Sequence, residues 1–279
     1  MTTMELRNYY TNRADSVDGA PADMVAACRD WPEAHAALLD ALESGNVAAT
    51  ERGDDGLWRA VPWMKAAILA GFRASIVVPY DDWPGGAMDK SAFPPRAFVL
   101  PDGVRVVPGG SSVRRGARIE PGVVIMPPSY VNVGAVVGAG TMVDSHVLVG
   151  SCARIGRDVH LSAGVQIGGV LEPAGALPVV IEDGAFLGAQ SAVLEGVIVR
   201  ERAVLAPGTI LSGSLTIYDL VHGRELRGEI PAGAVVVPGS RPATGAFARD
   251  RGLQLYAPCI VKYRDDGTDA ALALERALR

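Results

Sequence analysis

The chain is 279 residues long and carries a formal net charge of −5, with 49% hydrophobic and 20% charged residues. This length accommodates one large domain or two modest ones, and the acidic balance argues against nucleic acid or an anionic membrane surface as the main partner. Aromatic residues make up only 6%, whereas Gly (33) and Pro (19) are abundant, which is typical of many short strands joined by tight turns.

The three cysteines, Cys28, Cys152 and Cys259, lie far apart and have no metal-ligand spacing. This pattern predicts a reduced, cytoplasmic protein without a bound metal. No hydrophobic run approaches the roughly 18 residues of a membrane span, and the first segment, MTTMELRNYYTNRAD, lacks the apolar core of a signal peptide. We therefore expect an intracellular protein that does not bind membranes.

The first hundred residues have helical character. The stretch 21–46 is rich in Ala and Leu and ends at Gly45 and Asn46, which is a typical helix stop. Residues 63–75 predict a second, more buried helix, while the proline-broken segment 79–98 is expected to be a linker. Residues 1–100 are thus predicted to form a helical N-terminal domain.

The middle of the chain is an internal repeat with a period of six. From residue 113 to 167 an Ile, Leu or Val falls at every sixth position, and after a break the series resumes at 181 and continues to 217. This period fits a triangular coil in which each face is a short strand with one aliphatic side chain pointing inward. The repeat therefore predicts a left-handed parallel β-helix over residues 101–238, within a mainly β fold. A β-sandwich would not keep a strict frame.

Two further features of the repeat agree with a coil. Glycine recurs three residues after the repeat position, where a corner needs backbone freedom: at 116, 122, 134, 140, 164, 184, 196 and 208. The segment 168–180, GGVLEPAGALPVV, interrupts the frame. It predicts an excursion loop that leaves one corner and returns, and such loops often carry function.

After residue 217 the periodicity loosens. Residues 239–279 are predicted to form a C-terminal cap, with strands in VVVPGS and LYAPCIVKY and a helix over 268–279 that covers the open end of the coil.

Several polar residues are not required by the repeat: Arg105, Asp144, His146, His160, Glu172 and Glu195. A carboxylate or imidazole beside an amine could act as a general base. The structural alternatives are equally open, because Asp after a strand is often a turn residue and a lone His is more often a hydrogen-bonded core residue. No P-loop, dinucleotide fingerprint, nucleophile elbow or zinc signature occurs, so the repeat predicts the fold and leaves the reaction open.

The longest motifs are more specific than a generic hexapeptide. The runs YVN, GTMVD, VGSC, VHLS, GGVLEP and EGVIV, together with the flanking segments from about residue 35 to 265, resemble the tetrahydrodipicolinate N-succinyltransferase family of diaminopimelate and lysine biosynthesis. The resemblance implies a homotrimer with active sites between subunits, a soluble cytoplasmic enzyme, and succinyl-CoA as a co-substrate with no tightly bound cofactor.

The same resemblance implies roles for individual residues. Asp144 of GTMVD would be a catalytic or amine-binding carboxylate, with His146 beside it. Arg105 of RVVP would bind a substrate carboxylate, and Glu172 would belong to a mobile loop over the site. His160 of VHLS is a further candidate for substrate contact, and Lys262 of IVK for CoA phosphates.

The sequence also departs from the family pattern. The segment before EGVIV reads AQSAVLEG where the family has roughly ARSEVVEG, so Gln190 stands for an Arg and Ala192 for a proposed catalytic Glu. Thr216 stands for another Arg, and position 146 is commonly Trp. Two alternatives therefore stay open: a specialised paralogue that acylates a related amino acid, with acetyl-CoA as a possible donor, as in the tabtoxin-pathway homologue, and a non-catalytic scaffold. A metal-dependent carbonic-anhydrase-like site is disfavoured, because the four His residues have no suitable spacing.

Overall fold

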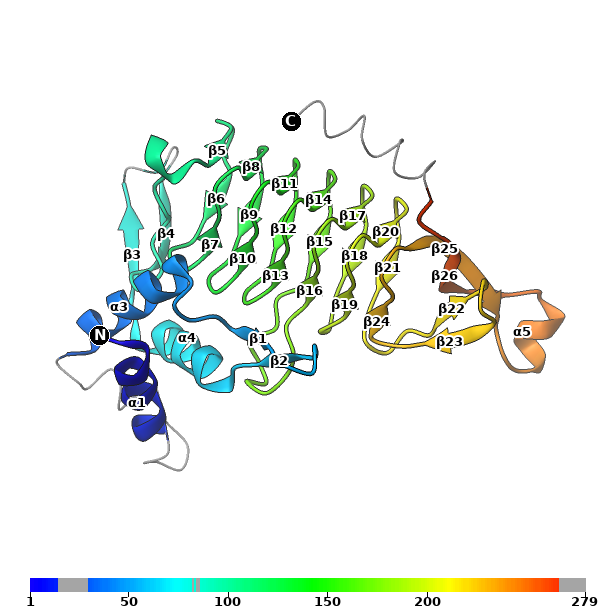
Figure 1. The fold of residues 1–279 in the computed structure, drawn as a ribbon, viewed down its shortest axis with the longest axis horizontal. Coiled ribbons are helices and arrows are strands. Elements are labelled where there is room, and N and C mark those ends of the chain that lie inside the picture. Colours follow the sequence, from blue (N-terminus) through cyan, green and yellow to red (C-terminus); the bar gives the residue numbers. More distant parts are fainter. Residues whose placement is uncertain (15–29, 82, 84–85, 266–279) are drawn as a thin grey trace.

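The computed structural model describes residues 1–14, 30–81, 83 and 86–265. The described part of the N-terminal region contains the helices α1 (Thr3–Ala14), α3 (Trp31–Ser44) and α4 (Pro62–Ala74). They cluster at one end of an elongated coil, and the C-terminal strands lie at the other end (Figure 1). Within the described residues, no helix is long and apolar enough to span a membrane. The predicted helix over 268–279 lies outside the described residues.

Helices α3 and α4 form where the sequence predicted them. Each has a proline in its first turn, and α3 ends at Gly45, whose φ of 80° is the left-handed conformation of a C-cap. Leu38 and Leu42 on α3 and Ile68 on α4 are fully or nearly fully buried in one hydrophobic cluster, which extends onto the coil. The N-terminal region is therefore packed on the coil through a shared core.

Two antiparallel hairpins accompany these helices: one joins α3 to α4, and the other lies between α4 and the coil. The first, β1 (Thr50–Arg52) with β2 (Trp58–Ala60), forms an arm that runs beside the coil (Figure 1). The second, β3 (Val77–Tyr80) with β4 (Ala87–Lys90), lies within the segment expected to be a linker. That expectation was wrong in part, because Pro79 stands in an edge strand and Pro94 and Pro95 follow the hairpin, where a missing N–H costs no ladder hydrogen bond.

The repeat forms a triangular coil whose stacked strands pair parallel in three sheets; the ten-stranded sheet also includes the antiparallel C-terminal strands. The ten-stranded sheet contains β5 (Arg105–Val106), β8 (Val124–Ile125), β11 (Met142–Val143), β14 (His160–Leu161), β17 (Phe186–Leu187), β20 (Val204–Leu205), β25 (Ala234–Pro242), β26 (Gln254–Tyr263), β22 (Ile217–Asp219) and β23 (Arg224–Leu226). A six-stranded sheet, named the third sheet, contains β6 (Ser112–Val113), β9 (Tyr130–Val131), β12 (Leu148–Val149), β15 (Gln166–Ile167), β18 (Ala192–Val193) and β21 (Ile210–Leu211). The other six-stranded sheet faces the β1–β2 arm and is named the arm-side sheet. It contains β7 (Arg118–Ile119), β10 (Val136–Val137), β13 (Arg154–Ile155), β16 (Val180–Ile181), β19 (Ile198–Val199) and β24 (Glu229–Ile230). A 3-10 turn, Leu100–Asp102, precedes the coil.

The predicted repeat positions are the core of this coil. Every repeat position from Val113 to Ile217 is buried in one hydrophobic cluster, and parallel pairing stacks those from Val113 to Leu211 on the equivalent residue of a neighbouring coil, as with Val143, Leu161 and Leu187. Burying one such side chain contributes about 1.5–3 kcal/mol. The preceding residue of each two-residue strand points outward. The predicted left-handed parallel β-helix is thereby confirmed.

The corners explain the glycines of the repeat. The position three residues after the repeat residue has φ between 67° and 81° wherever it is one of the eight repeat glycines, and the same left-handed backbone occurs there at His146, Cys152, Asp158, Gln190 and Arg202. Left-handed backbone is unfavourable for residues with a Cβ. The backbone conformation at these five positions is therefore unfavourable, and packing between the coils on either side offsets that cost.

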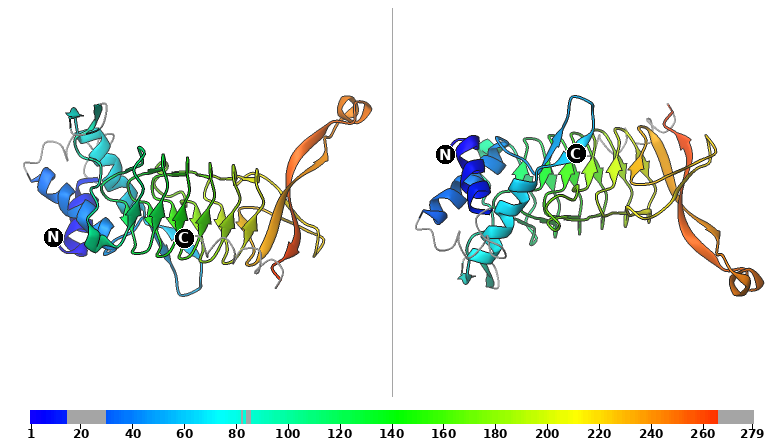
Figure 2. Two further views of the ribbon diagram at one scale, coloured as in Figure 1. Left: turned by 90° about the horizontal axis from the view of Figure 1, so that it is seen from above. Right: turned by 90° about the horizontal axis from the view of Figure 1, so that it is seen from below.

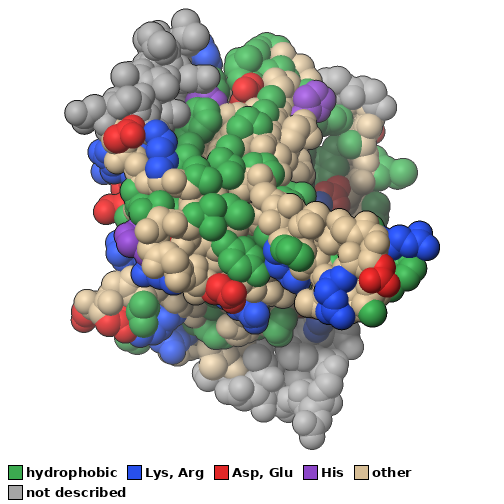
Figure 3. All heavy atoms as spheres, turned by 90° about the vertical axis from the view of Figure 1, so that its right-hand side faces the viewer, with side chains coloured by type: hydrophobic (Ala, Val, Ile, Leu, Met, Phe, Trp, Pro, Cys, Tyr) green, Lys and Arg blue, Asp and Glu red, His purple; other side chains and the backbone are tan. Residues whose placement is uncertain are grey.

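The C-terminal region forms a long ribbon. β25 and β26 pair antiparallel and extend away from the end of the coil, with the short helix α5 (Ala246–Asp250) at the tip (Figure 2). β25 runs through the predicted boundary at residue 238, so the last coil and the ribbon share a strand. Figure 3 views this end and shows hydrophobic side chains over its centre. Leu220, Leu253 and Leu255 are among its exposed residues.

His35 is a buried histidine that makes the N-terminal region sensitive to acid. Its Nε2 donates to the Ala92 carbonyl at 3.0 Å, and its ring stacks on Trp31 and meets the edge of Phe93. Burial lowers the pKa of His35 from 6.5 to about 4. The unfolded chain therefore takes up a proton below pH 6.5 while the folded chain does not, so stability is complete above pH 6.5 and is lost as the pH falls towards 4.

We expect this loss to reach about 3 kcal/mol in the free energy of unfolding, from 1.36 kcal/mol per pKa unit. Urea unfolding between pH 7.5 and pH 4.5 measures it. His35→Gln should flatten this pH dependence, whereas His146→Gln, at an exposed histidine, should retain it. An unchanged slope in His35→Gln would contradict the assignment.

Candidate active site

Asp144 and His146 lie together at the corner between the ten-stranded sheet and the third sheet. Asp144 follows β11 and is half-buried; its N–H donates to the Leu161 carbonyl at 3.0 Å, and its Oδ1 accepts the Ser145 N–H at 2.7 Å. The carboxylate thus accepts a hydrogen bond within its own turn, as expected for an Asp with a structural role. Its second oxygen makes no hydrogen bond within the described part of the chain, so it is available to a hydrogen-bond donor.

His146 occupies the corner itself. It is exposed, with φ of 62°, and its backbone N–H donates to the Pro128 carbonyl at 2.7 Å. Beside it is an open cavity of about 310 Å³ on the third sheet, lined also by Ser129, Tyr130 and Gln166. Burial raises the pKa of Tyr130, so its phenol stays neutral and can donate a hydrogen bond. The cavity offers neutral polar groups and one imidazole.

Arg105 and His160 lie in one outward row of the ten-stranded sheet. The strand register places Arg105 beside Val124, then Met142, then His160, then Phe186. Arg105 is exposed and therefore available to an anion. His160 is buried and stacks on Phe186, with ring centroids 4.8 Å apart. Within this chain its ring is a packing element, and its contact with substrate stays a prediction.

Glu172 lies in the excursion loop, at a different corner from Asp144. The loop leaves the third sheet after β15 and enters the arm-side sheet at β16. Glu172 is 66% exposed and forms an ion pair with Arg73 of α4, with 3.5 Å between Nη2 and Oε1. Asp144 and Glu172 are therefore at opposite edges of the third sheet. One chain does not bring them together.

The loop is held by a buried lysine that the sequence reading missed. Lys65 of α4 has no exposed surface, and its Nζ donates to the carbonyls of Pro173 at 2.9 Å and Ala176 at 2.7 Å. Burial lowers the pKa of Lys65 and raises the pKa of the nearby Cys152 thiol to about 12. Cys152 therefore stays a protonated thiol and is unsuited to nucleophilic attack.

Replacing Lys65 with Met should loosen the excursion loop. Two hydrogen bonds from a charged donor would be lost, each worth about 1.5–3 kcal/mol, so the amide of Ala176 should exchange its hydrogen at least about tenfold faster. Lys90→Met is the matched control, because Lys90 Nζ donates to the Ser75 carbonyl at 2.8 Å, outside the loop. Equal exchange of Ala176 in both variants would show that Lys65 does not hold the loop.

The other predicted residues lie apart from this corner. Lys262 is on β26, about half exposed, and its Nζ is 3.2 Å from Asp265 Oδ2. Ala192 points outward from β18, between Gln166 and Ile210 in the register. Gln190 occupies a corner with φ of 61°. The outward row of the third sheet thus carries no charged side chain next to the His146 cavity.

The sequence signal for the cavity residues is their place directly before a repeat position. Tyr130, Leu148 and Gln166 each stand directly before a repeat position, and every such residue points outward. Across the described residues, no three His, Cys, Asp or Glu side chains are placed to hold a metal ion. The arrangement offers a carboxylate and an imidazole at a coil corner and an exposed guanidinium on the adjoining sheet, which together could receive a proton and bind an anion.

Comparisons with known proteins agree with the repeat and extend it. A model of the hexapeptide repeat of succinyl-transferase matches residues 178–212. A 2,3,4,5-tetrahydropyridine-2,6-dicarboxylate N-succinyltransferase from Maricaulis maris is 47% identical, and one from Ruegeria pomeroyi is 46% identical, each over 100% of both chains. One from Methylococcus capsulatus is 49% identical over 88% of this chain and 90% of that protein.

The solved structures are more distant. One from Campylobacter jejuni, titled as a 2,3,4,5-tetrahydropyridine-2-carboxylate N-succinyltransferase, is 17% identical with a TM-score of 0.46 and covers 81% of this chain and 62% of that one. The likeness in sequence is much stronger, because it reaches nearly half of all residues over the whole length of the relatives. The chain is an acyltransferase of the hexapeptide-repeat type and belongs to the 2,3,4,5-tetrahydropyridine-2,6-dicarboxylate N-succinyltransferase family.

Proposed function

We propose that this protein transfers the succinyl group of succinyl-CoA to the amine of L-2-amino-6-oxopimelate, the opened form of tetrahydrodipicolinate, in diaminopimelate and lysine biosynthesis. The observation that carries this proposal is the identity of 40–49% with relatives of that name over most or all of the chain. We place the enzyme in the cytoplasm, with acyl-CoA as a co-substrate and no tightly bound cofactor.

The reaction requires the protein to position the two substrates and to supply one base. The neutral amine attacks the thioester carbonyl carbon, a C–N bond forms and the C–S bond breaks. Asp144 is the proposed acceptor of the ammonium proton, with His146 as an alternative base two residues away. The departing CoA thiolate takes up a proton, so the step is balanced. Moving a proton in this way typically contributes about 10²–10⁴-fold in rate.

The remaining candidate residues would bind and orient the substrates. Arg105, exposed in the outward row that contains Met142, would form a bidentate pair with a substrate carboxylate. Glu172 would take part through the excursion loop, and His160 would line the acceptor side. Lys262, at the far end of the ten-stranded sheet, would contact the CoA phosphates.

We further propose that the enzyme is a homotrimer with sites between subunits. Asp144 and Glu172 lie at opposite edges of the third sheet within one chain, so a site that uses both requires a neighbouring subunit. Apolar side chains on the outer faces of two sheets support the same reading: Met142, Phe186 and Val204 on the ten-stranded sheet, and Leu148 and Ile210 on the third sheet. Ile210 is 44% exposed in the single chain. Sedimentation of the purified protein tests this assembly.

A second candidate function rests on Ala192. This outward position on β18 adjoins Gln166 and Ile210 and has no carboxylate. An enzyme without an acid there would be suited to a related amino acid and to acetyl-CoA in a specialised pathway. The two functions differ in the donor and the acceptor they require.

The product distinguishes them. Incubating the protein with L-2-aminopimelate, a stable acceptor analogue, and either succinyl-CoA or acetyl-CoA should yield the N-succinyl product, identified by its mass. An N-acetyl product, or no product with this acceptor despite binding of CoA, would favour the specialised function. Failure to bind any CoA thioester would favour a non-catalytic scaffold.

A further inference from the structure

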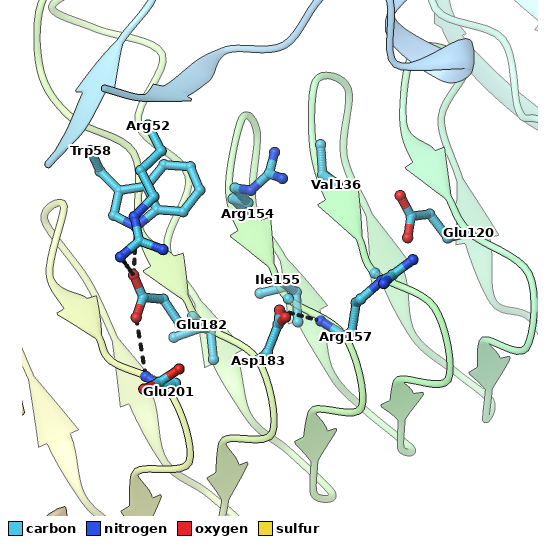
Figure 4. Close-up of a pocket in the computed structure, with 13 residues that line it drawn as sticks. Arg52, Trp58, Glu120, Val136, Arg154, Ile155, Arg157, Glu182, Asp183 and Glu201 are labelled. Atoms are coloured by element: carbon cyan, nitrogen blue, oxygen red, sulfur yellow. Dashed lines mark hydrogen bonds and ion pairs between the residues drawn. The ribbon is translucent and has the colours of Figure 1, made fainter. Parts of the chain in front are cut away.

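A second cavity lies on the opposite side of the coil from the Asp144 corner. It has a volume of about 390 Å³, is partly open, and lies between the β1–β2 arm and the arm-side sheet (Figure 4). Arg52 and Trp58 come from the arm, while Arg154, Arg157 and Glu182 come from the coil. None of its lining residues is shared with the His146 cavity.

The most buried acid of this cavity is already satisfied. Glu182 is 8% exposed; its Oε1 accepts the Trp58 indole N–H at 2.8 Å and the Arg200 guanidinium at 3.0 Å, while its Oε2 accepts the Glu201 N–H at 3.1 Å. These bonds lower its pKa against the opposing effect of burial. Glu182 therefore fixes the arm to the coil and has little capacity left for a further cation.

Two other acids are engaged as well. Asp183 Oδ1 accepts the backbone N–H of Arg157 at 2.8 Å. Glu120 pairs with Arg118 at 2.8 Å and its other oxygen accepts the Ala139 N–H at 3.0 Å. Glu182 and Glu120 are thus paired with arginines, whereas Asp183 accepts a backbone N–H and a fourth acid, Glu201, also lines the cavity.

The arginines of the coil are not paired in this way. The half-buried Arg154 lies over the Trp58 ring, 5.0 Å from its centre, and Arg157 is exposed. Among the described residues, neither guanidinium forms a hydrogen bond or an ion pair. Arg154 carries five N–H donors on a planar group whose orientation the indole restricts. The cavity therefore presents two guanidinium groups with unused N–H donors, one of them held in a preset orientation, and such groups recognise a carboxylate or phosphate.

We propose that this cavity is a binding site for a small organic anion, held by its carboxylate or phosphate group between Arg154 and Arg157 with Trp58 as a wall. The site is separate from acyl transfer and does not depend on the proposed reaction. Because the arm and the coil each supply part of the cavity, a bound anion would tie the arm, and through β2 the start of α4, more firmly to the coil. This suits a ligand that modulates the enzyme rather than one that is converted.

Calorimetric titration of the full chain with succinate and with inorganic phosphate, at equal ionic strength in chloride, tests the proposal. We expect saturable binding of at least one anion, with the stronger of the two indicating which group is recognised. Arg154→Gln and Arg157→Gln should each weaken it by about tenfold or more, since charge-assisted hydrogen bonds are lost. Arg227→Gln, at an exposed arginine outside the cavity, should bind as the unaltered protein does.

Arg157 is exposed, so its variant is expected to fold even if Arg154→Gln does not. Binding should also persist in the presence of saturating CoA, which distinguishes this cavity from the acyl-transfer site. Two results would overturn the proposal: no saturable binding of either anion, or equal affinity in both cavity variants and Arg227→Gln. A change of oligomeric state in Arg154→Gln, without anion binding, would instead assign the cavity to a subunit contact.

Discussion

Replacing Asp144 with Asn is expected to lower kcat for acyl transfer by about 10²–10⁴-fold, the range typical of losing a general base. Asn keeps an oxygen that can accept the Ser145 N–H, which Asp144 Oδ1 accepts at 2.7 Å. The corner should therefore keep its conformation, and the loss should come from the missing proton acceptor. Release of CoA thiol from succinyl-CoA measures the rate, and circular dichroism checks the fold.

Asp158→Asn is the matched control for this experiment. Asp158 also stands at a coil corner, with φ of 51°, but at the corner between the arm-side and the ten-stranded sheets. Asn tolerates left-handed backbone, so the control should fold and retain its activity. If Asp144→Asn were as active as Asp158→Asn, the base would have to be sought elsewhere, and the double variant with His146→Gln would be the next to measure.

Replacing Leu161 with Ala should reduce the free energy of unfolding by about 2–5 kcal/mol. Leu161 has no exposed surface and lies between Val143 and Leu187 in the central stack of the ten-stranded sheet. The coil cannot collapse around the missing atoms, because the strands on both sides fix the spacing of the stack. A cavity therefore remains, and its cost adds to the lost burial.

Urea unfolding at one fixed protein concentration measures this loss. Ile198→Ala is the matched control: Ile198 is also aliphatic and lies in a two-residue strand, but its side chain points outward from the arm-side sheet. The outward variant should lose much less stability than the inward one. Equal losses would mean that the six-residue stack is not the main source of stability.

The coil could be predicted from the sequence because its energetics are periodic. Each inward position meets the same environment one coil above and below, so the requirement for an aliphatic residue repeats every six residues, from Val113 to Ile217. The corner position three residues later repeats for the same reason. The excursion loop was recognisable because residues 168–180 break both rules.

Contacts between distant segments could not be predicted in this way. The Trp58 indole binds Glu182 across 124 residues, and Lys65 binds Pro173 across 108. Neither contact leaves a local pattern, because each depends on how the arm and α4 pack against the finished coil. The arm cavity and the lysine that holds the loop were missed for this reason.

The candidate site could be predicted from the sequence only in part. Asp144 and His146 are neighbours in sequence and could be placed on one corner, and the register brings Arg105 into the row that contains Met142. The distance of Glu172 from this corner follows only from the path of the excursion loop. The sequence left both a structural role and a substrate contact open for His160; its ring is buried against Phe186, its neighbour in the same outward row.

The ratio of kcat/KM for succinyl-CoA to that for acetyl-CoA, with L-2-aminopimelate as acceptor, tests the central claim most directly. The proposed N-succinyltransferase function predicts a clear preference for succinyl-CoA, despite the alanine at position 192. A ratio at or below one would contradict that function and assign the chain to a specialised acyl transfer within the same family.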